Sequence, residues 1–190
     1  MGQYFKWFVK LNDTFFQFIE IYIGEGGMKL LEMAYLYNPY MLRLEKLISK
    51  GGLWYKQRIS LEGDYADHVH DCSFNLYQLT SGSVQFEHDY EVPRKNIDII
   101  TQYIYQNREE DKDNYIVNQN EFQYFVNHDT KQYIDKKKLE TDIHPLAILC
   151  SYGDNNYKES GKWRFNRLSV ENQIPADFTE YVFYEKDFSY

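Results

Sequence analysis

Two segments of this 190-residue chain carry the same pattern, 109 positions apart (161 − 52). Residues 52–62 read GLWYKQRISLE and residues 161–171 read GKWRFNRLSVE, so Gly, Trp, Arg, Ser and Glu fall at the same spacing in both. An ungapped match of this kind indicates two related structural units. Two copies are too few for a solenoid, in which each repeat contacts only its neighbours. The pattern therefore predicts one pseudo-symmetric body or two small packed lobes.

Weaker similarity extends the match upstream of each segment. Asp13-Thr14 corresponds to Asp129-Thr130, and residues 17–20 (QFIE) resemble residues 132–135 (QYID). Residues 28–34 (MKLLEMA) resemble residues 144–150 (HPLAILC). On this alignment the second copy is about seven residues shorter between its apolar helix and its Trp segment.

The order of these patterns predicts an α+β fold. Aromatic and β-branched runs in 4–11 and 14–23, separated by Asn12-Asp13, predict a hairpin. Helices are expected at 28–37, after Asn38-Pro39 up to a stop at Gly51, and at 143–151. Strands are expected at 53–61, 115–118, 121–127, 132–134 and 162–170, with a further helix at 93–104, a solvated run at 136–138 and a folded-back tail at 177–190.

These elements predict two related units, each made of a β-hairpin, a helix and a Trp strand. The first unit would cover residues 1–107, with a helical extension, and the second would cover 115–190. The charged run 108–114 is the expected linker between them.

The repeated Trp segments contain the first candidate site. On a strand, Trp54, Arg58 and Glu62 would share one face, because a spacing of four preserves the alternation of side chains, and Ile59 would lie on the other. Trp163, Arg167 and Glu171 would repeat the arrangement. One interpretation is a ligand-sensing or structural module with two equivalent binding patches. We favour a buried framework motif, because a duplicated feature more often maintains a fold.

The charge of the chain suggests a second kind of site. The formal net charge is −8, which opposes general phosphate binding and makes direct binding of nucleic acid an unfavoured interpretation. It suits a protein that docks on a basic partner, although acidity also simply keeps a Tyr-rich chain soluble. The acidic residues proposed for such an interaction are Glu62, Asp64, Asp67, Asp71, Glu109, Glu110, Asp111 and Asp113.

A third candidate is a dense group of possible metal ligands. Asp64, Asp67, His68, His70 and Asp71 fall within eight residues, and the two histidines would share a strand face. The second copy does not repeat the group, and no HExxH or paired CxxC accompanies it. A metal-dependent enzyme acting on a nucleotide or phosphoester is therefore an alternative hypothesis, and a polar loop is the favoured one.

No other pattern indicates catalysis or a cofactor. The chain has no GxSxG elbow, P-loop or GxGxxG, and Cys72 and Cys150 lie in no CxxC motif, which is typical of a reducing cytoplasm. His144 before Pro145 and His128 beside Asp129 suit capping and turn roles. No signal peptide is recognised and no apolar run approaches the ~20 residues of a membrane span.

Several of these segments resemble an uncharacterised bacterial and phage-associated family. The resemblance rests on Met1–Phe5, Val9–Asp13, Gly27–Glu32, Gly52–Ile59 with Gly63–Ala66, and, in the second half, 125–129, 143–146 and Trp163. The hairpin departs from the family pattern, since it reads Lys-Leu-Asn-Asp. The resemblance implies a bacterial cytoplasm or mobile-element setting, and it assigns no activity to any residue.

Together these observations predict a non-enzymatic, acidic protein-binding module without a cofactor or a membrane. The expected partner is a protein with a basic surface, such as a nucleic-acid-handling bacterial protein. In the setting that the resemblance implies, a phage or mobile-element inhibitor of the anti-defence or anti-CRISPR kind is a specific form of this hypothesis. The expected location is the cytoplasm of the bacterial host.

Overall fold

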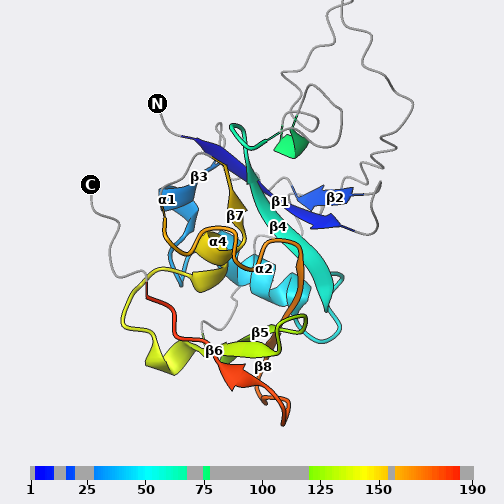
Figure 1. Ribbon diagram of the computed structural model, residues 1–190, viewed down its shortest axis with the longest axis vertical. Helices are drawn as coiled ribbons and strands as arrows, with labels where there is room; N and C mark the ends of the chain where they lie inside the picture. Colours follow the sequence, from blue (N-terminus) through cyan, green and yellow to red (C-terminus); the bar gives the residue numbers. More distant parts are fainter. Residues whose placement is uncertain are drawn as a thin grey trace, which may run out of the picture.

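The computed structural model describes residues 3–10, 16–19, 28–67, 75–77, 120–153 and 157–184 (Figure 1). Several predicted features lie outside these ranges: the Asn12-Asp13 turn, the 93–104 helix, the 108–114 linker and the 115–118 strand. The described residues combine helices with a mixed sheet, which confirms the α+β class.

The strands of the described residues form one nine-stranded sheet. Seven of them lie in the order β2 (Phe16–Ile19), β1 (Tyr4–Lys10), β4 (Gln57–Gly63), β8 (Asn166–Glu171), β5 (Tyr124–Asn127), β6 (Gln132–Asp135) and β9 (Thr179–Glu180). In addition, β3 (Met28–Lys29) pairs with β1, and β7 (Ser151–Tyr152) pairs with β4. The pairs β4–β7 and β6–β9 are parallel and the others are antiparallel. The central pair β4–β8 therefore joins the first part of the chain to the second.

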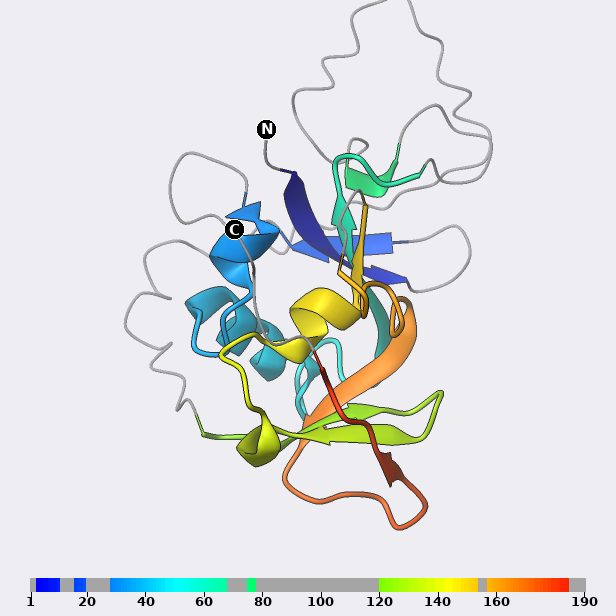
Figure 2. The same cartoon turned by 60° about the vertical axis from the view of Figure 1, so that its left-hand side comes forward.

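The helices lie together inside the curve of this sheet. These are α1 (Leu30–Met33), α2 (Pro39–Ile48) and α4 (Pro145–Leu149). The sheet twists so strongly that β1 and the β5–β6 hairpin lie at opposite ends of the molecule, with α2 and α4 between them (Figure 2). This arrangement gives α2 and α4 contact with strands from both parts of the chain.

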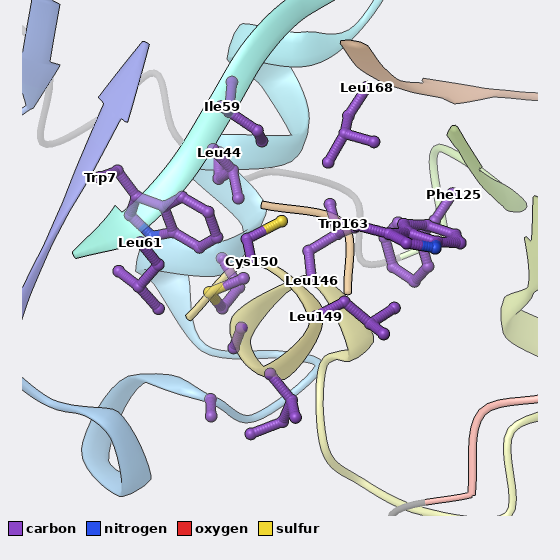
Figure 3. Close-up of a cluster of buried hydrophobic side chains, with 14 of the residues drawn as sticks. Trp7, Leu44, Ile59, Leu61, Phe125, Leu146, Leu149, Cys150, Trp163 and Leu168 are labelled. Atoms are coloured by element: carbon purple, nitrogen blue, oxygen red, sulfur yellow. The ribbon is translucent and has the colours of Figure 1, made fainter. Parts of the chain in front are cut away.

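The core lies between the helices and the sheet. Along β4 and β8 the side chains alternate between the two faces: Ile59, Leu61 and Leu168 are fully buried on one face, and Arg58 and Arg167 are exposed on the other. The second face is exposed only near the arginines, since its Ser60, Glu62 and Ser169 are buried. The buried strand residues surround apolar side chains of α2 and α4, including Leu44, Leu146, Leu149 and Cys150 (Figure 3). Each fully buried Leu or Ile contributes roughly 1.5–3 kcal/mol relative to an exposed one.

Both longer helices begin with the same chemistry. Asn38 caps α2, its Oδ1 accepting from the Tyr40 N–H at 2.9 Å, and Pro39 occupies the first helical position. His144 caps α4, its Nδ1 accepting from the Leu146 N–H at 3.2 Å, and Pro145 follows it. The predicted start of α2 after Asn38 and the capping role of His144 are confirmed, whereas α4 begins at Pro145, two residues later than the predicted 143.

Several element boundaries were predicted wrongly. The 28–37 helix is reduced to α1, because Met28-Lys29 instead pairs with β1. The 136–138 run is a 3₁₀ helix, and its Lys136 is not solvated, since only 13% of its side chain is exposed. The tail was predicted to fold back over 177–190, and its described strand is only the two-residue β9, which pairs with β6. The hairpins β1–β2 and β5–β6 are confirmed.

The two Trp segments begin as turns, and the strands follow later than predicted. β4 begins at Gln57 and β8 at Asn166, each directly after a residue with positive φ: Lys56 at 55° and Phe165 at 54°. The Trp54 N–H donates to the Leu47 carbonyl, and the Trp163 N–H donates to the Leu149 carbonyl, both at 2.8 Å. Each Trp is thus tied to the end of a helix and not to the strand that it precedes.

Candidate functional site

The two tryptophans are core residues. Trp54 is fully buried and Trp163 is 1% exposed, and both belong to the same cluster as Ile59 and Leu61. The prediction that each Trp shares a strand face with Arg58 and Glu62, or with Arg167 and Glu171, is wrong, because each Trp precedes its strand in a turn that directs the chain inward. Burial undermines the ligand-sensing hypothesis and agrees with the framework interpretation.

The two arginines of the repeated segments face each other at the centre of the sheet. Arg58 of β4 and Arg167 of β8 are direct partners in the antiparallel pair. One carboxylate joins them: Arg58 Nη1 donates to Asp129 Oδ2 at 2.7 Å, and Arg167 Nε donates to Asp129 Oδ1 at 2.6 Å. Both side chains remain about half exposed, at 47% and 51%. Sequence reasoning selected both arginines but not the acid that links them.

Asp129 is held in place by the turn between β5 and β6. The N–H groups of Asp129 and Thr130 donate to Asn127 Oδ1 at 3.0 and 3.1 Å, which fixes the turn. The Arg167 N–H donates to Asp129 Oδ2 at 3.0 Å. Burial tends to raise the pKa of Asp129, but the Arg167 hydrogen bonds and the Arg58 charge outweigh it, so the pKa lies below its usual value. Asp129 is therefore a carboxylate at neutral pH.

A second charged cluster lies at the other end of β4. Glu62 is buried, and Arg164 grips its carboxylate with two bonds, Nε to Oε1 at 2.8 Å and Nη2 to Oε2 at 3.1 Å. Ser60 also donates to Glu62. The Arg164 guanidinium stacks on the Tyr152 ring at 3.5 Å. Burial raises the pKa of Glu62, and the Arg164 hydrogen bond and charge only partly offset that effect.

The candidate acidic and metal-binding residues divide into three groups. Glu62 is 1% exposed, so it is not available to a protein partner as predicted. Asp64 is half-buried and accepts from the Tyr4 N–H at 3.2 Å, whereas Asp67 is exposed and accepts from the Tyr152 hydroxyl. The remaining candidates lie outside the described residues: His68, His70, Asp71, Glu109, Glu110, Asp111 and Asp113.

The metal hypothesis depends mainly on residues outside the described ranges. Within those ranges no group of three or more His, Cys, Asp or Glu is placed to hold a metal ion. Asp64 and Asp67 each already accept a hydrogen bond from the protein. A metal site at 64–71 stays a prediction, and stoichiometric metal in the purified protein is the measurement that decides it.

A buried cluster that the sequence did not reveal lies under the sheet. Glu45 of α2 accepts from Lys136 Nζ at 2.6 Å and lies 3.1 Å from His144 Nε2. Because His144 Nδ1 accepts from the backbone, its Nε2 carries the proton and donates to Glu45. Lys136 also lies 5.0 Å from the centre of the Phe125 ring. Burial lowers the pKa of His144 despite the neighbouring Glu45. Both imidazole nitrogens are thus engaged within the fold.

Cys150 is also a structural residue. It is fully buried at the end of α4, and burial raises the pKa of its thiol far above the usual value. A buried thiol of this kind is a poor nucleophile, because the thiolate is the reactive form. Cys72 lies outside the described residues.

Charge is distributed unevenly along the chain. The described residues contain 16 Lys and Arg against 14 Asp and Glu, a formal net charge of +2. The remaining residues contain 5 against 15, a formal net charge of −10. The acidity of the chain therefore lies outside the sheet and helices described above, and the exposed Arg58–Arg167 pair belongs to a part with a slight positive excess.

Comparisons with known proteins returned no similarity: no family model, curated protein or solved structure matches this chain. Among the described residues, no helix has both the length and the apolar character that crossing a bilayer requires.

Proposed function

We propose that this chain is a non-enzymatic protein-binding module that docks on a basic surface of a nucleic-acid-handling bacterial protein. The observation that carries the proposal is the uneven charge, with a net −10 on the residues outside the described sheet and helices. Clustered acids speed encounter with a basic partner and fix its orientation. Of the acids predicted to contact the partner, Asp67 is exposed, whereas Glu62 is buried and cannot contact a partner protein.

The engagement of the ionisable groups in the core supports the non-enzymatic part of the proposal. His144 uses one nitrogen as a helix cap and the other on Glu45. Glu62 is held by Arg164 and Ser60. A general acid or base needs a free atom within reach of a substrate, whereas the nitrogens of His144 and the carboxylate of Glu62 are hydrogen-bonded within the fold.

We further propose that the body consists of two related units, as the repeat predicts. The strand order β2-β1-β4 followed by β8-β5-β6 is a palindrome of hairpin and Trp strand. Within each hairpin the registers correspond, since Trp7 pairs with Ile19 and Phe125 with Ile134. The same correspondence aligns Gln17 with Gln132, as in the sequence match.

Reciprocal hydrogen bonds across the central strand pair support the same proposal. The Lys56 N–H donates to the Leu168 carbonyl at 3.1 Å, and the Phe165 N–H donates to the Ile59 carbonyl at 2.7 Å. These four residues are related in pairs by the repeat offset of 109 (165 − 56 and 168 − 59). Arg58 and Arg167, related by the same offset, face each other between them. A pseudo-two-fold axis through this arginine pair accounts for all of these contacts.

The helix that matches α4 in this scheme is α2, whereas the sequence alignment matched α4 to residues 28–34. Each of these two helices has a side-chain cap followed by Pro and ends near a serine whose Oγ donates three residues back, Ser49 to Lys46 at 2.7 Å and Ser151 to Ile148 at 2.8 Å. Ser49 then pairs in parallel with Val170 of β8, as Ser151 does with Leu61 of β4. Residues 28–34 (MKLLEMA) and 144–150 (HPLAILC) therefore share a spacing of apolar residues, but they do not occupy equivalent positions in the two units.

The phage or mobile-element setting rests on the family resemblance alone, and the cytoplasmic location rests on the resemblance and on cysteine usage typical of a reducing compartment. An inhibitor that occupies a basic nucleic-acid path would need acidic groups to face it, and the surplus of acids outside the described residues supports this form of the proposal.

The test is capture of partners by the tagged protein from a bacterial host lysate, with mass spectrometry, for three forms of the chain. These are the natural sequence, a variant with Glu109→Gln, Glu110→Gln, Asp111→Asn and Asp113→Asn, and a control with Glu32→Gln, Glu121→Gln, Asp177→Asn and Glu180→Gln. The control removes the same charge from surface ion pairs, which contribute little to stability.

We expect one basic partner, released by raised salt, with the natural sequence and the control, and its loss with the 109–113 variant. Equal capture by all three forms, or a partner whose capture is insensitive to salt, would contradict the acidic docking proposal.

A further inference from the structure

The exposed arginine pair at the centre of the sheet points to a small-ligand site that is independent of the protein-binding proposal. Like charges directly opposite each other on neighbouring strands destabilise a sheet. Asp129 compensates only one of the two positive charges of Arg58 and Arg167. The fold therefore keeps an excess positive charge at a fixed, half-exposed position.

The hydrogen-bond geometry leaves donors of both guanidiniums available. Arg167 uses Nε on Asp129, and among the described residues no partner contacts its Nη1 or Nη2. Arg58 uses Nη1 on Asp129 and on the Phe165 carbonyl, which leaves its Nε and Nη2 without a described partner. Asp129 thus holds the guanidinium groups of both arginines in fixed orientations, with N–H donors left over for an anion.

Neighbouring groups add to the positive potential. The His128 N–H donates to the Arg167 carbonyl at 2.9 Å and the Lys56 N–H donates to the Leu168 carbonyl at 3.1 Å, so both residues are backbone neighbours of the pair. Burial lowers the pKa of His128, and the Lys56 and Arg167 charges lower it further against the opposing charges of Glu171 and Asp129. His128 is fixed by a 2.8 Å hydrogen bond between its Nε2 and Ser169 Oγ. Lys56 is exposed, with its Nζ 5.0 Å from the centre of the Tyr55 ring.

We propose that Arg58 and Arg167, held by Asp129 and assisted by Lys56, bind the terminal phosphate of a phosphomonoester. Two guanidinium forks match the oxygens of a tetrahedral dianion, and their excess charge complements it. A phosphodiester polymer is disfavoured, because such ligands need a track of cations along the backbone. Here Lys10 is the partner of Arg58 on β1, but Asp129 lies between the two arginines and the Glu171 charge acts on the neighbouring His128, so acidic groups interrupt the cations.

The test is isothermal titration at low ionic strength with inorganic phosphate, with phosphoserine and with a short single-stranded oligonucleotide. The variants are Arg58→Gln, Arg167→Gln and Arg167→Lys, and the control is Lys137→Gln, which removes an exposed positive charge from the 3₁₀ helix. Circular dichroism melting establishes that each variant is folded. If the Gln variants do not fold, Arg167→Lys tests the site, because it keeps the charge and loses the fork.

We expect one phosphate or phosphoserine per chain, with affinity about tenfold or more weaker in each arginine variant and within about twofold in the control. Absence of stoichiometric binding, or an equal loss in Lys137→Gln, would overturn the proposal. Tighter binding of the oligonucleotide than of phosphoserine, lost in the same variants, would overturn the ligand class.

Discussion

Glu62 and Arg164 form a largely buried ion pair whose separation would destabilise the fold. Glu62 is 1% exposed and Arg164 is 26% exposed in its side chain, so the two bonds between them are shielded from solvent. Removing one member of a buried pair leaves an uncompensated charge. Loss of Arg164 would leave the Glu62 carboxylate unpaired, and burial already raises the pKa of Glu62.

We expect Arg164→Gln to reduce the free energy of unfolding by about 3 kcal/mol at pH 8, and by less at pH 5. A carboxyl group whose folded pKa is raised favours the folded state below its unfolded pKa, and that contribution is lost as pH rises through the folded pKa. Without Arg164 the folded pKa of Glu62 rises further, so the deficit grows with pH. Urea denaturation of both proteins at each pH measures it.

The control is Arg164→Gln in a Glu62→Gln background, where no buried carboxylate remains. There we expect a smaller loss with no change between pH 5 and pH 8. Because burial lowers the pKa values of His128 and His144, every variant loses stability as pH falls below about 6.5, and comparison at equal pH cancels this common effect. A deficit independent of pH would show that Arg164 acts through packing alone.

At this scale the sequence predicted roles that depend on near neighbours. The His144 cap is readable because its partner is two residues away. Glu45 binds His144 and Lys136 from 99 and 91 residues away, and no local pattern marks such a contact. Arg58 and Arg167 were found through the repeat, but Asp129, 71 and 38 residues away from them, was not.

The connection between α2 and β4 is the element on which the position of Trp54 depends. After α2 the chain passes Gly51, at φ 88°, and Gly52, whose N–H donates to the Ser49 carbonyl at 2.8 Å. A Cβ on Gly52 would lie 2.3 Å from the carbonyl oxygens of Lys46 and Leu47. The backbone of the turn therefore packs directly on the last turn of the helix.

We expect Gly52→Ala to cost more than about 3 kcal/mol, since the atoms it meets are backbone atoms that cannot rotate away. Gly51→Ala is the matched control, because it meets nothing within 4 Å and suffers only the strain of a left-handed conformation, about 1–2 kcal/mol. Thermal and urea unfolding of both variants provide the comparison. Equal losses at the two positions would mean that the close approach is relieved by a small shift of the turn.

The sequence predicted the hairpins and helix starts because caps, prolines and alternation are local signals. It placed the Trp residues on strands because the left-handed residues that end the turns are Lys56 and Phe165, where glycine would have been the recognisable signal. It overestimated the first helix because the residues Met28 and Lys29 form a ladder with β1, a tertiary pairing that overrides helical spacing.

At the scale of the whole molecule, the two halves of the chain share one core. Ser49, directly after α2 of the first half, pairs with Val170 of the second, and β7 of the second half pairs with β4 of the first. Each half therefore lacks part of its own core. The repeat predicted two units but could not predict this exchange, because sequence similarity does not reveal which copy a segment packs against.

We expect residues 1–107 and 115–190, expressed separately, to be unfolded, and to form a folded one-to-one complex when expressed together. The exposed β4 and β8 edges and the missing helix contacts are the physical reason. Circular dichroism melting and size-exclusion chromatography measure this outcome. As a control, the intact chain cut within 108–114 after folding should keep its secondary structure. A cooperative transition from either fragment alone would indicate independent domains.

The facing of Arg58 and Arg167 also bears on how such a chain could arise. If the two proposed units descend from one gene segment that was duplicated and fused, its ancestor was a homodimer in which this arginine stood on the symmetry axis opposite its own copy. No single mutation could then have given the two positions different charges. Fusion removes that constraint, because the two copies can then change independently. The turns that contain the Trp residues differ in this way, since Tyr55 is at the position equivalent to Arg164 in the other half. On that history the arginine pair is inherited from the dimer, whereas the contact that Glu62 makes with Arg164 is possible in one half only.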